Sequence, residues 1–397
     1  MKDLLYLLFF LSISITAQNM DKGFQYLENQ QYAEAETFFT RILENYPRNK
    51  TARLCYGRAI GLNGKPTEAL SLFETLHKDH PENFEIKLNF AEAMLWNSLF
   101  SRAKGFYEIL LQETPKSFPA LLGYANTLSN LKEYESAIVF VNKALEVSPK
   151  NPNAVISKKY IFLGYAYQQQ QNQQYKKSEL LLKKNLVDLP NDQETLLNLA
   201  NLYLIMLDLE KARQTYLAIG KNPKGTVPSL NGLSLVMHLH GKEKKALQTS
   251  TKAYELLPTI KDLEIIRQTK ERYIQALLWN KKYKSVEPLI NELNQKFPNE
   301  NWILALSASL HSYKGDFKES LEKYNSILKN DANSFDGNLG KANVLKAQKN
   351  YSEAFKMAEK TLSIYNEQAD AIHLRNNLKL LFTPAYDGKF SYSFDNG

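Results

Sequence analysis

The chain has 397 residues, of which 44% are hydrophobic, 23% charged and 12% aromatic, and its formal net charge is +8 at pH 7. Its single cysteine, Cys55, excludes an internal disulfide and a cysteine-rich metal site. The sequence has no glycine-rich phosphate loop, nucleophile elbow or paired-cysteine motif, so the common signatures of catalysis are missing.

The first residues are predicted to direct export. Met1, Lys2 and Asp3 precede an apolar run from Leu4 to Ile15, which the small residues of Thr16-Ala17 follow. The run is too short to span a bilayer and ends in small residues, as cleaved secretory signals do. We expect residues 1–17 to be a signal peptide. Because Asp3 offsets the charge of Lys2, a retained anchor is the alternative.

Small residues then recur at an interval of 34. The interval slips once by seven residues and once by six, which gives three series: Ala35, Ala69, Ala103 and Ala137; Ser178, Ala212 and Ala246; Val286, Ser320 and Ala354. Such self-similarity predicts ten copies of one unit, each of which buries a face on its neighbours.

Other residue types follow the same rhythm. Prolines stand twelve residues after the small position, at Pro47, Pro81, Pro115, Pro149, Pro190, Pro258 and Pro298. Larger side chains stand four residues after it, at Phe39, Phe73, Tyr107, Val141, Leu182, Tyr216, Ile290 and Tyr324. A second small row stands twelve residues before it, from Gly23 and Gly57 to Ala342. Each proline is predicted to end a helix, so every unit consists of two closely packed antiparallel helices.

These rows resemble the tetratricopeptide repeat family. The resemblance implies an all-α fold for residues 18–382, a right-handed superhelical solenoid of about ten helix-turn-helix units. It also implies a noncatalytic scaffold without cofactors. The departures are local: unit eight has Ile274 and Val286 at its two small positions, and units nine and ten lack the final proline.

In that family the first helix of each repeat lines a concave groove. By resemblance, one groove-facing position per unit falls on Arg58, Glu92, Asn126, Tyr167, Asn201, Leu235, Gln275, Ser309 and Asn343. Some family members clamp a peptide carboxylate with Lys and Asn from consecutive repeats. Leu122 and Gly164 stand where those residues would be, so a clamp of this kind is not expected. The aromatic and amide groups suit an extended peptide or a sugar.

The two slips fall on distinctive sequences. The first includes the glutamine-rich stretch from Tyr165 to Tyr175, and we expect both helices of unit five to be one turn longer. The second lies between Pro258 and Tyr273, where the default interpretation is a longer linker. Residues 241–284 carry eleven Lys or Arg against five acids. The basic patch of Lys244, Lys245, Lys281, Lys282 and Lys284 could attract an anionic polymer or a lipid surface, or it could be a solvated helix face.

Two histidine pairs, His77 with His80 and His238 with His240, lack the usual helical spacing of zinc ligands and a third partner. We therefore predict no metal site. Cys55 lies on the first helix of unit two, where the ordinary interpretation is a small buried apolar residue.

After the last repeat, Ala369 to Leu381 is predicted to form the helix that caps the array. Phe390, Tyr392 and Phe394 then alternate with polar residues, the pattern of a strand, within an extended tail of residues 383–397. This arrangement is similar to outer-membrane proteins in which periplasmic repeats precede a β-barrel, as in exopolysaccharide exporters and the YaiO-type family. A plain docking tail is the alternative.

Taken together, the sequence predicts an exported scaffold of the periplasm or outer membrane of a Gram-negative bacterium. We expect it to bind a protein or peptide, or an anionic or polysaccharide polymer, along its groove. Export makes nucleic acid an unexpected partner. The alternative function is the periplasmic part of an outer-membrane protein for export or assembly.

Overall fold

The fold was analysed in a computed structural model that describes residues 20–220 and 223–382, with only the backbone of Pro223 and Lys224. Within this part the chain forms twenty-one α-helices and one short 3₁₀ helix, so the all-α prediction is confirmed. Contacts divide the chain into two units, Met1–Gly164 and Tyr165–Gly397, and the boundary falls inside one long helix.

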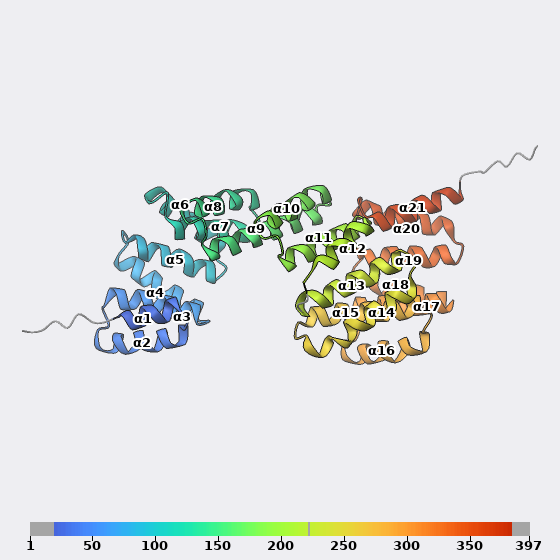
Figure 1. The fold of residues 1–397 in the computed structure, drawn as a ribbon, viewed down its shortest axis with the longest axis horizontal. Helices are drawn as coiled ribbons and strands as arrows, with labels where there is room; N and C mark the ends of the chain where they lie inside the picture. Colours follow the sequence, from blue (N-terminus) through green and yellow to red (C-terminus); the bar gives the residue numbers. More distant parts are fainter. Residues whose placement is uncertain (1–19, 221–222, 383–397) are drawn as a thin grey trace, which may run out of the picture. The chain divides into compact units, whose positions relative to one another are not determined.

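The N-terminal unit is built from antiparallel helix pairs (Figure 1). Its helices are α1 (Asp21–Glu28), α2 (Tyr32–Asn45), α3 (Lys50–Leu62), α4 (Pro66–Asp79), α5 (Phe84–Trp96), α6 (Phe100–Glu113), α7 (Phe118–Asn130) and α8 (Tyr134–Val147). Helix α9 (Pro152–Gln171) begins in this unit and ends in the next.

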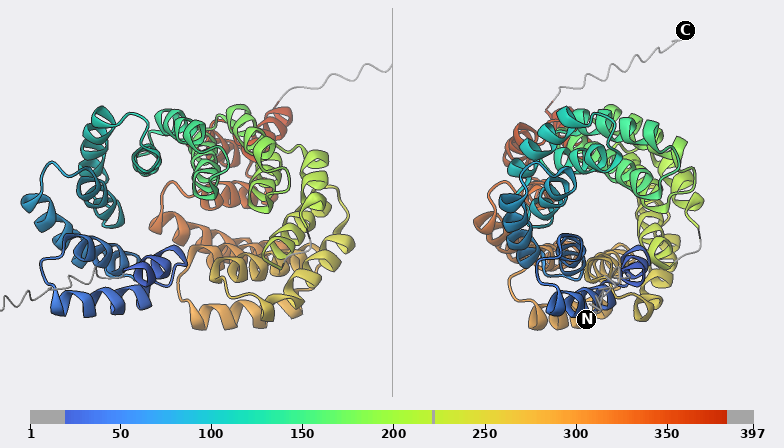
Figure 2. Two further views of the ribbon diagram at one scale, coloured as in Figure 1. Left: turned by 60° about the vertical axis from the view of Figure 1, so that its left-hand side comes forward. Right: turned by 90° about the vertical axis from the view of Figure 1, so that its left-hand side faces the viewer.

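The C-terminal unit continues the pairing, as the two views of Figure 2 show for its helices. They are α10 (Tyr175–Asp188), α11 (Gln193–Ile205), α12 (Leu209–Ala218), α13 (Pro223–Leu239), α14 (Glu243–Glu255), η1 (Leu257–Thr259), α15 (Leu263–Trp279), α16 (Tyr283–Lys296), α17 (Asn301–Lys314), α18 (Phe317–Asn330), α19 (Phe335–Ala347), α20 (Tyr351–Ile364) and α21 (Ala369–Leu381). Ten pairs and a final helix therefore match the predicted ten units, and α21 has the predicted bounds of the capping helix.

Local sequence explains where the helices begin and end. Helices α2, α4, α6 and α8 each end two residues before a proline of the predicted row. A polar residue two positions after each proline then caps the next helix. Asn49, Asn83 and Ser117, for example, accept hydrogen bonds from the backbone N–H groups of Ala52, Ile86 and Ala120. Each proline and cap thus separate one repeat from the next.

The turn inside each repeat has one residue with positive φ. These residues are Gln30, Gly64, Ser98, Lys132, Gln173, Leu207, Gly241, Lys281, Gly315 and Lys349. Only three are glycines, although glycine adopts this conformation at the lowest cost. The 34-residue register therefore imposes the turn even where the local sequence does not favour it.

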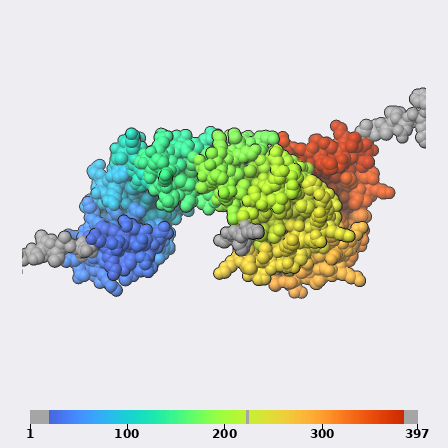
Figure 3. Space-filling model, in the orientation of Figure 1, coloured from blue at the N-terminus to red at the C-terminus, as the bar shows by residue number. Residues whose placement is uncertain are grey.

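Packing follows the small and large rows. Ala35, Ala69, Ala103 and Ala137 are fully buried, as are Phe39, Phe73 and Tyr107 of the large row. A Cβ atom added to Gly57 would lie only 2.6 Å from the Phe73 ring, so the small row provides the space that the large side chains occupy. In the space-filling view the side chains of neighbouring pairs, such as α13 to α16, close into a continuous surface (Figure 3).

Both predictions about the slips need correction. Helix α9 has 20 residues while α10 has the usual 14, so the first helix of unit five takes up all seven extra residues and the second is not longer. Helix α15 has 17 residues where α17 has 14 and most other first helices have 13, so most of the second slip extends a helix and not a linker. In each case extra helical turns keep the backbone hydrogen-bonded, which an inserted loop would not.

Unit eight, with two large residues at its small positions, keeps the fold but packs less closely. Ile274 and Val286 are both buried, and the backbones of α15 and α16 lie farther apart than those of α17 and α18. The predicted signal peptide (residues 1–17) and the predicted strand (residues 390–394) lie outside the described residues.

Candidate functional site

Two adjoining pockets form a groove on the first helices of the C-terminal unit. The α11–α15 pocket has a volume of about 320 Å³ and is lined by α11, α13 and α15 together with Tyr216 of α12. The α15–α19 pocket, of about 200 Å³, is lined by α15, α17 and α19 together with Tyr324 of α18. Glu271 lines both pockets, so the two pockets adjoin, and together they involve the first helices of five repeats.

Four of the predicted groove residues lie in these pockets. Asn201 lines the first pocket, and Gln275, Ser309 and Asn343 line the second. Leu235 is half-buried on α13 and lines neither. Asn126 is half-buried and Tyr167 is exposed, each on a first helix. Whether any of these residues binds a partner stays a prediction.

Tyrosines from the outer helices reach the groove through gaps left by glycines. The Tyr216 hydroxyl donates to Oδ1 of Asn201 at 2.5 Å, and the Tyr324 hydroxyl lies 3.4 Å from Oγ of Ser309. A Cβ atom added to Gly232 would lie 2.1 Å from the Tyr216 ring, and one added to Gly340 would lie 2.3 Å from the Tyr324 ring. These tyrosines are largely buried, but their hydroxyl ends contact groove-facing residues.

The N-terminal unit contains the same arrangement. Tyr107 packs against Gly123, where an added Cβ would lie 2.3 Å from the hydroxyl oxygen. That hydroxyl is buried and has no hydrogen-bond partner among the described residues. Burial and the charge of Glu92 raise the pKa of Tyr107 above its usual value. The phenol therefore stays protonated and able to donate a hydrogen bond.

Arg58 and Glu92, two further predicted groove residues, face each other. Nη1 of Arg58 lies 3.8 Å from Oε2 of Glu92 and donates to Oδ1 of the buried Asn89 at 3.2 Å. Burial raises the pKa of Glu92, and the Arg58 charge opposes that shift. Desolvation thus has the larger effect on this carboxyl group.

Helix α15 adds charged residues that the sequence reasoning did not identify. Arg267 donates two hydrogen bonds to Glu264, at 2.6 and 2.8 Å, and a third to Glu271 at 3.0 Å. The hydrogen bonds from Arg267 lower the pKa of Glu264 to about 2. Burial instead raises the pKa of Glu271. Glu264 and Glu271 therefore share the Arg267 guanidinium. For Glu271, the more buried of the two, the ion pair does not offset the cost of desolvating the charge.

A positional signal for these residues does exist. Residues four and seven positions before a groove-facing residue lie on the same helix face. Counted back from Gln275 they are Glu271 and Gln268, and counted back from Asn343 they are Leu339 and Asp336, all of which line a pocket. The prediction used one position per helix where the groove uses three.

The five lysines of the basic patch are exposed in two neighbouring turns and the helix starts that follow them. Nδ2 of Asn280, beside Lys281, donates to the carbonyl of Glu243, beside Lys244, at 2.9 Å. This bond holds the two turns together. None of the five forms an ion pair with a described residue. Whether the patch binds a polymer stays a prediction.

The histidines and Cys55 occupy packed positions. His77 lies between the rings of Phe90 and Phe106, at centroid distances of 5.4 and 5.6 Å. His238 stacks on Trp279 and its Nδ1 lies 2.8 Å from Glu243. Residues 20–220 and 223–382 contain no group of three or more His, Cys, Asp or Glu side chains arranged for a metal ion. Cys55 is a free, buried thiol, as expected.

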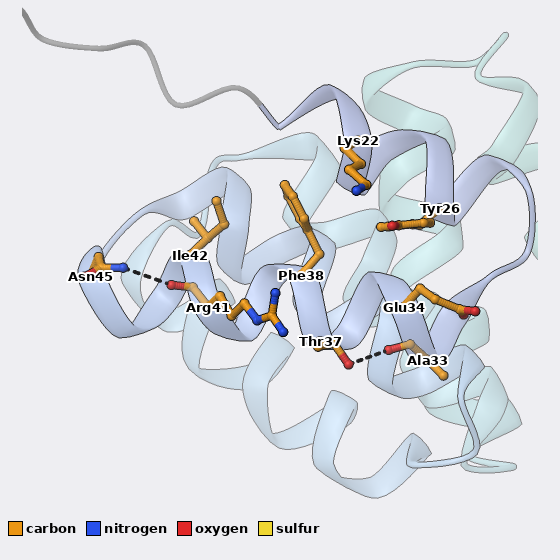
Figure 4. Close-up of a pocket in the computed structure, with 9 residues that line it drawn as sticks. All are labelled: Lys22, Tyr26, Ala33, Glu34, Thr37, Phe38, Arg41, Ile42 and Asn45. Atoms are coloured by element: carbon orange, nitrogen blue, oxygen red, sulfur yellow. Dashed lines mark hydrogen bonds between the residues drawn. The ribbon is translucent and has the colours of Figure 1, made fainter.

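A further hollow lies elsewhere, on α1 and α2 (Figure 4). Its volume is about 680 Å³, and only residues of the first repeat line it. Lys22 lies over the ring of Tyr26, which meets Phe38 edge-on at 6.4 Å. The hollow lies on a face of the first helix pair that no other described helix covers. It is therefore separate from the groove of the C-terminal unit.

No helix in the described part of the chain combines the length and apolarity needed to cross a membrane.

Comparisons with family models identify tetratricopeptide repeats in two segments of the chain. Models of the tetratricopeptide repeat match residues 21–83 and residues 118–151. The crystal structure of a tetratricopeptide repeat protein from Parabacteroides merdae is 20% identical, with a TM-score of 0.41, and the alignment covers 63% of this chain and 96% of that one. Yeast Tom70 is 13% identical, with a TM-score of 0.42 and coverage of 91% and 95%. TM-scores below 0.5 establish no shared overall arrangement. Among curated proteins, none matches the sequence.

Proposed function

Because the chain is a tetratricopeptide repeat protein, a protein-binding scaffold by family, we propose that it binds its partner in the groove of the C-terminal unit, on the exported side of a bacterial envelope. The groove-facing residues and the two pockets support this assignment. Repeats of this kind bury their faces on one another and leave the first helices to meet a partner.

The continuity of the two pockets through Glu271 is the observation that carries the proposal. Five first helices contribute polar and apolar side chains to the two adjoining pockets, which an extended polypeptide could follow from repeat to repeat. The groove also offers amide groups at Asn201, Gln275 and Asn343, which can both donate and accept hydrogen bonds. Such groups suit a main chain or a sugar, and the family favours a protein.

Export rests on residues 1–17 alone, whose apolar run and small residues are typical of a secretory signal. Mass spectrometry of the protein purified from its own cells tests this part. We expect a mature chain that starts near Gln18, in the periplasmic or envelope fraction. An intact Met1 in the cytoplasmic fraction would contradict export and leave the scaffold function untouched.

The basic patch supports a second candidate partner, an anionic polymer. Its five lysines have no carboxylate partners among the described residues, lie in two adjacent turns and the helix starts that follow them, and line neither groove pocket. A polymer bound there would dissociate as salt rises.

Capture from an envelope extract separates the two candidates. The full chain is compared with a groove variant, Asn201→Ala with Asn343→Ala, and with a patch variant, Lys244→Gln with Lys282→Gln. We expect the groove variant to lose the partner protein and the patch variant to retain it. Equal capture by all three proteins would contradict the proposal that the partner binds in the groove.

A further inference from the structure

The groove of the C-terminal unit carries an excess of negative charge. Asp262, Glu264 and Glu271 line the α11–α15 pocket, where Arg272 is the one cationic side chain among the described lining residues. Glu271 and Asp336 line the α15–α19 pocket, to which no described lysine or arginine contributes. The groove is therefore acidic in a chain whose net charge is +8.

Internal ion pairs cancel only part of this charge. Arg267 is occupied by Glu264 and Glu271, as described above, and Oδ1 of Asp262 accepts the backbone N–H groups that begin α15. Asp336 accepts no hydrogen bond from any described residue, although its charge raises the pKa of Glu271 and the charge of Arg267 lowers the pKa of Asp336 itself. Asp336 is exposed to solvent, and desolvation by the groove wall still raises the pKa of its carboxyl group. A cation beside Asp336 and Glu271 would relieve both effects.

The wall of the α11–α15 pocket holds a buried acceptor without a donor. The Thr269 hydroxyl donates its only hydrogen to the carbonyl of Ile265, so the amide group of Asn231 must donate to Thr269, at 2.8 Å. Oδ1 of Asn231 is then left without a partner among the described residues, in a side chain that is only 8% exposed. An N–H or O–H group of a ligand, or an ordered water molecule, would satisfy this atom.

Arg272 supplies the complementary group in the same wall. Its Nη1 donates to Oε1 of Gln275 at 2.6 Å, and its guanidinium lies over the Trp279 ring at 5.7 Å. Its Nε is buried and has no acceptor among the described residues. One unpaired acceptor and one unpaired donor match the N–H and C=O groups of a peptide unit.

A guanidinium already contacts two residues that line the α15–α19 pocket, although Arg267 itself does not line it. Arg267 lies over the ring of Trp302, a lining residue, at 5.7 Å from the ring centroid, while it contacts Glu264 and Glu271. Aromatic faces and carboxylates together favour cations.

We propose that this groove binds an extended polypeptide segment through a lysine or arginine side chain, whose cation lies between Glu271 and Asp336. The main chain of the segment pairs with Asn231 and Arg272 after a small rotation of these side chains. The inference rests on the scaffold function proposed above and adds to it a preference for basic segments.

The experiment presents the full chain to a phage library of random dodecapeptides and determines the composition of the retained peptides. We expect Lys and Arg to be enriched about tenfold over Asp and Glu, as a single charge-assisted contact allows. Nonspecific attraction to a chain of charge +8 would enrich acidic peptides instead, so the expected sign is specific.

Three variants locate the effect. Asp336→Asn removes a carboxylate that accepts no hydrogen bond from described residues, so it should leave the fold intact and reduce the enrichment severalfold. Glu271→Gln should do the same. Glu322→Gln, which removes an exposed carboxylate from the outer helix α18, is the matched control and should change nothing.

The outcomes are distinct. Retained peptides without a basic preference, or a preference that Asp336→Asn leaves unchanged, would overturn the inference and leave the scaffold function standing. Retention of no peptide would also overturn the inference. The scaffold function would then be tested separately, by whether the groove variant fails to capture the partner protein from the envelope extract.

Discussion

Arg58 and Glu92 occupy equivalent positions of consecutive repeats, and their side chains meet, with Nη1 and Oε2 3.8 Å apart. A residue in the groove-facing row can therefore contact the next member of the row directly. The pair is half-buried, and desolvation raises the pKa of Glu92 in spite of Arg58. In this pair the cost of burying a charge exceeds the benefit of the ion pair.

Glu92→Gln tests that balance. A carboxyl whose pKa is raised on folding contributes stability below its unfolded pKa, and this contribution is lost as pH rises through the folded value. Urea unfolding at pH 4 and at pH 7 gives the free energy of unfolding of both proteins. We expect the value for the variant, relative to that of the native chain, to be higher at pH 7 than at pH 4. A relative loss over that interval would show that the ion pair with Arg58 dominates.

Gly232→Ala and Gly340→Ala test the passage of tyrosines to the groove. The added Cβ atoms would lie 2.1 and 2.3 Å from the Tyr216 and Tyr324 rings, so we expect a loss of about 1–3 kcal/mol in the free energy of unfolding. Gly105→Ala is the control, because no atom lies within 4 Å of its added Cβ. In the exposed interior of α6 it should stabilise by about 0.5–1 kcal/mol. Equal effects at all three sites would contradict the role of the gaps.

Lys132→Gly tests the turn conformation. Lys132 is exposed with a φ of 63°, and the equivalent residue of unit two is Gly64. Since glycine adopts this region without strain, the variant should stabilise the protein by about 0.5–1 kcal/mol in urea unfolding. Gly64→Ala, as the reciprocal control, should destabilise it. A destabilised Lys132→Gly variant would show that the register does not strain the turn.

Cys55 should be inert in the native protein. Burial raises the pKa of its thiol to about 11, so only about one molecule in a thousand carries the thiolate at pH 8. We expect no labelling by iodoacetamide at pH 8 within an hour, and complete labelling in 6 M guanidinium chloride. Stoichiometric labelling of the native chain would mean that α3 opens readily.

Most of the fold could be predicted from the sequence because the packing residues and the residues that end helices repeat at the same interval. The prolines, the small rows and the capping helix Ala369–Leu381 each follow from local rules, and the helices begin and end accordingly. The slips were misjudged because an insertion of seven residues fits helical periodicity equally well in one helix or in two. Packing against neighbouring helices is what places all seven extra residues in α9.

The groove was harder to predict. Tyr107, Tyr216 and Tyr324 belong to the same row as Phe39 and Phe73, so as packing residues they look alike. Their hydroxyl groups, and a glycine sixteen positions later in each case, are what distinguish them. Asp336 and Glu271 were missed because acids are common on solvated helix faces, and their lack of compensation is visible only when several repeats are brought together.

Site-specific photo-crosslinking tests the central claim, that a partner binds in the groove of the C-terminal unit, most directly. A benzophenone amino acid is placed at Gln275 or Asn343, which line the α15–α19 pocket, or at Ser326, which is exposed on the outer helix α18. The account predicts that one partner protein is crosslinked from both groove positions and not from Ser326. Crosslinking from Ser326 with none from Gln275 or Asn343 would contradict it.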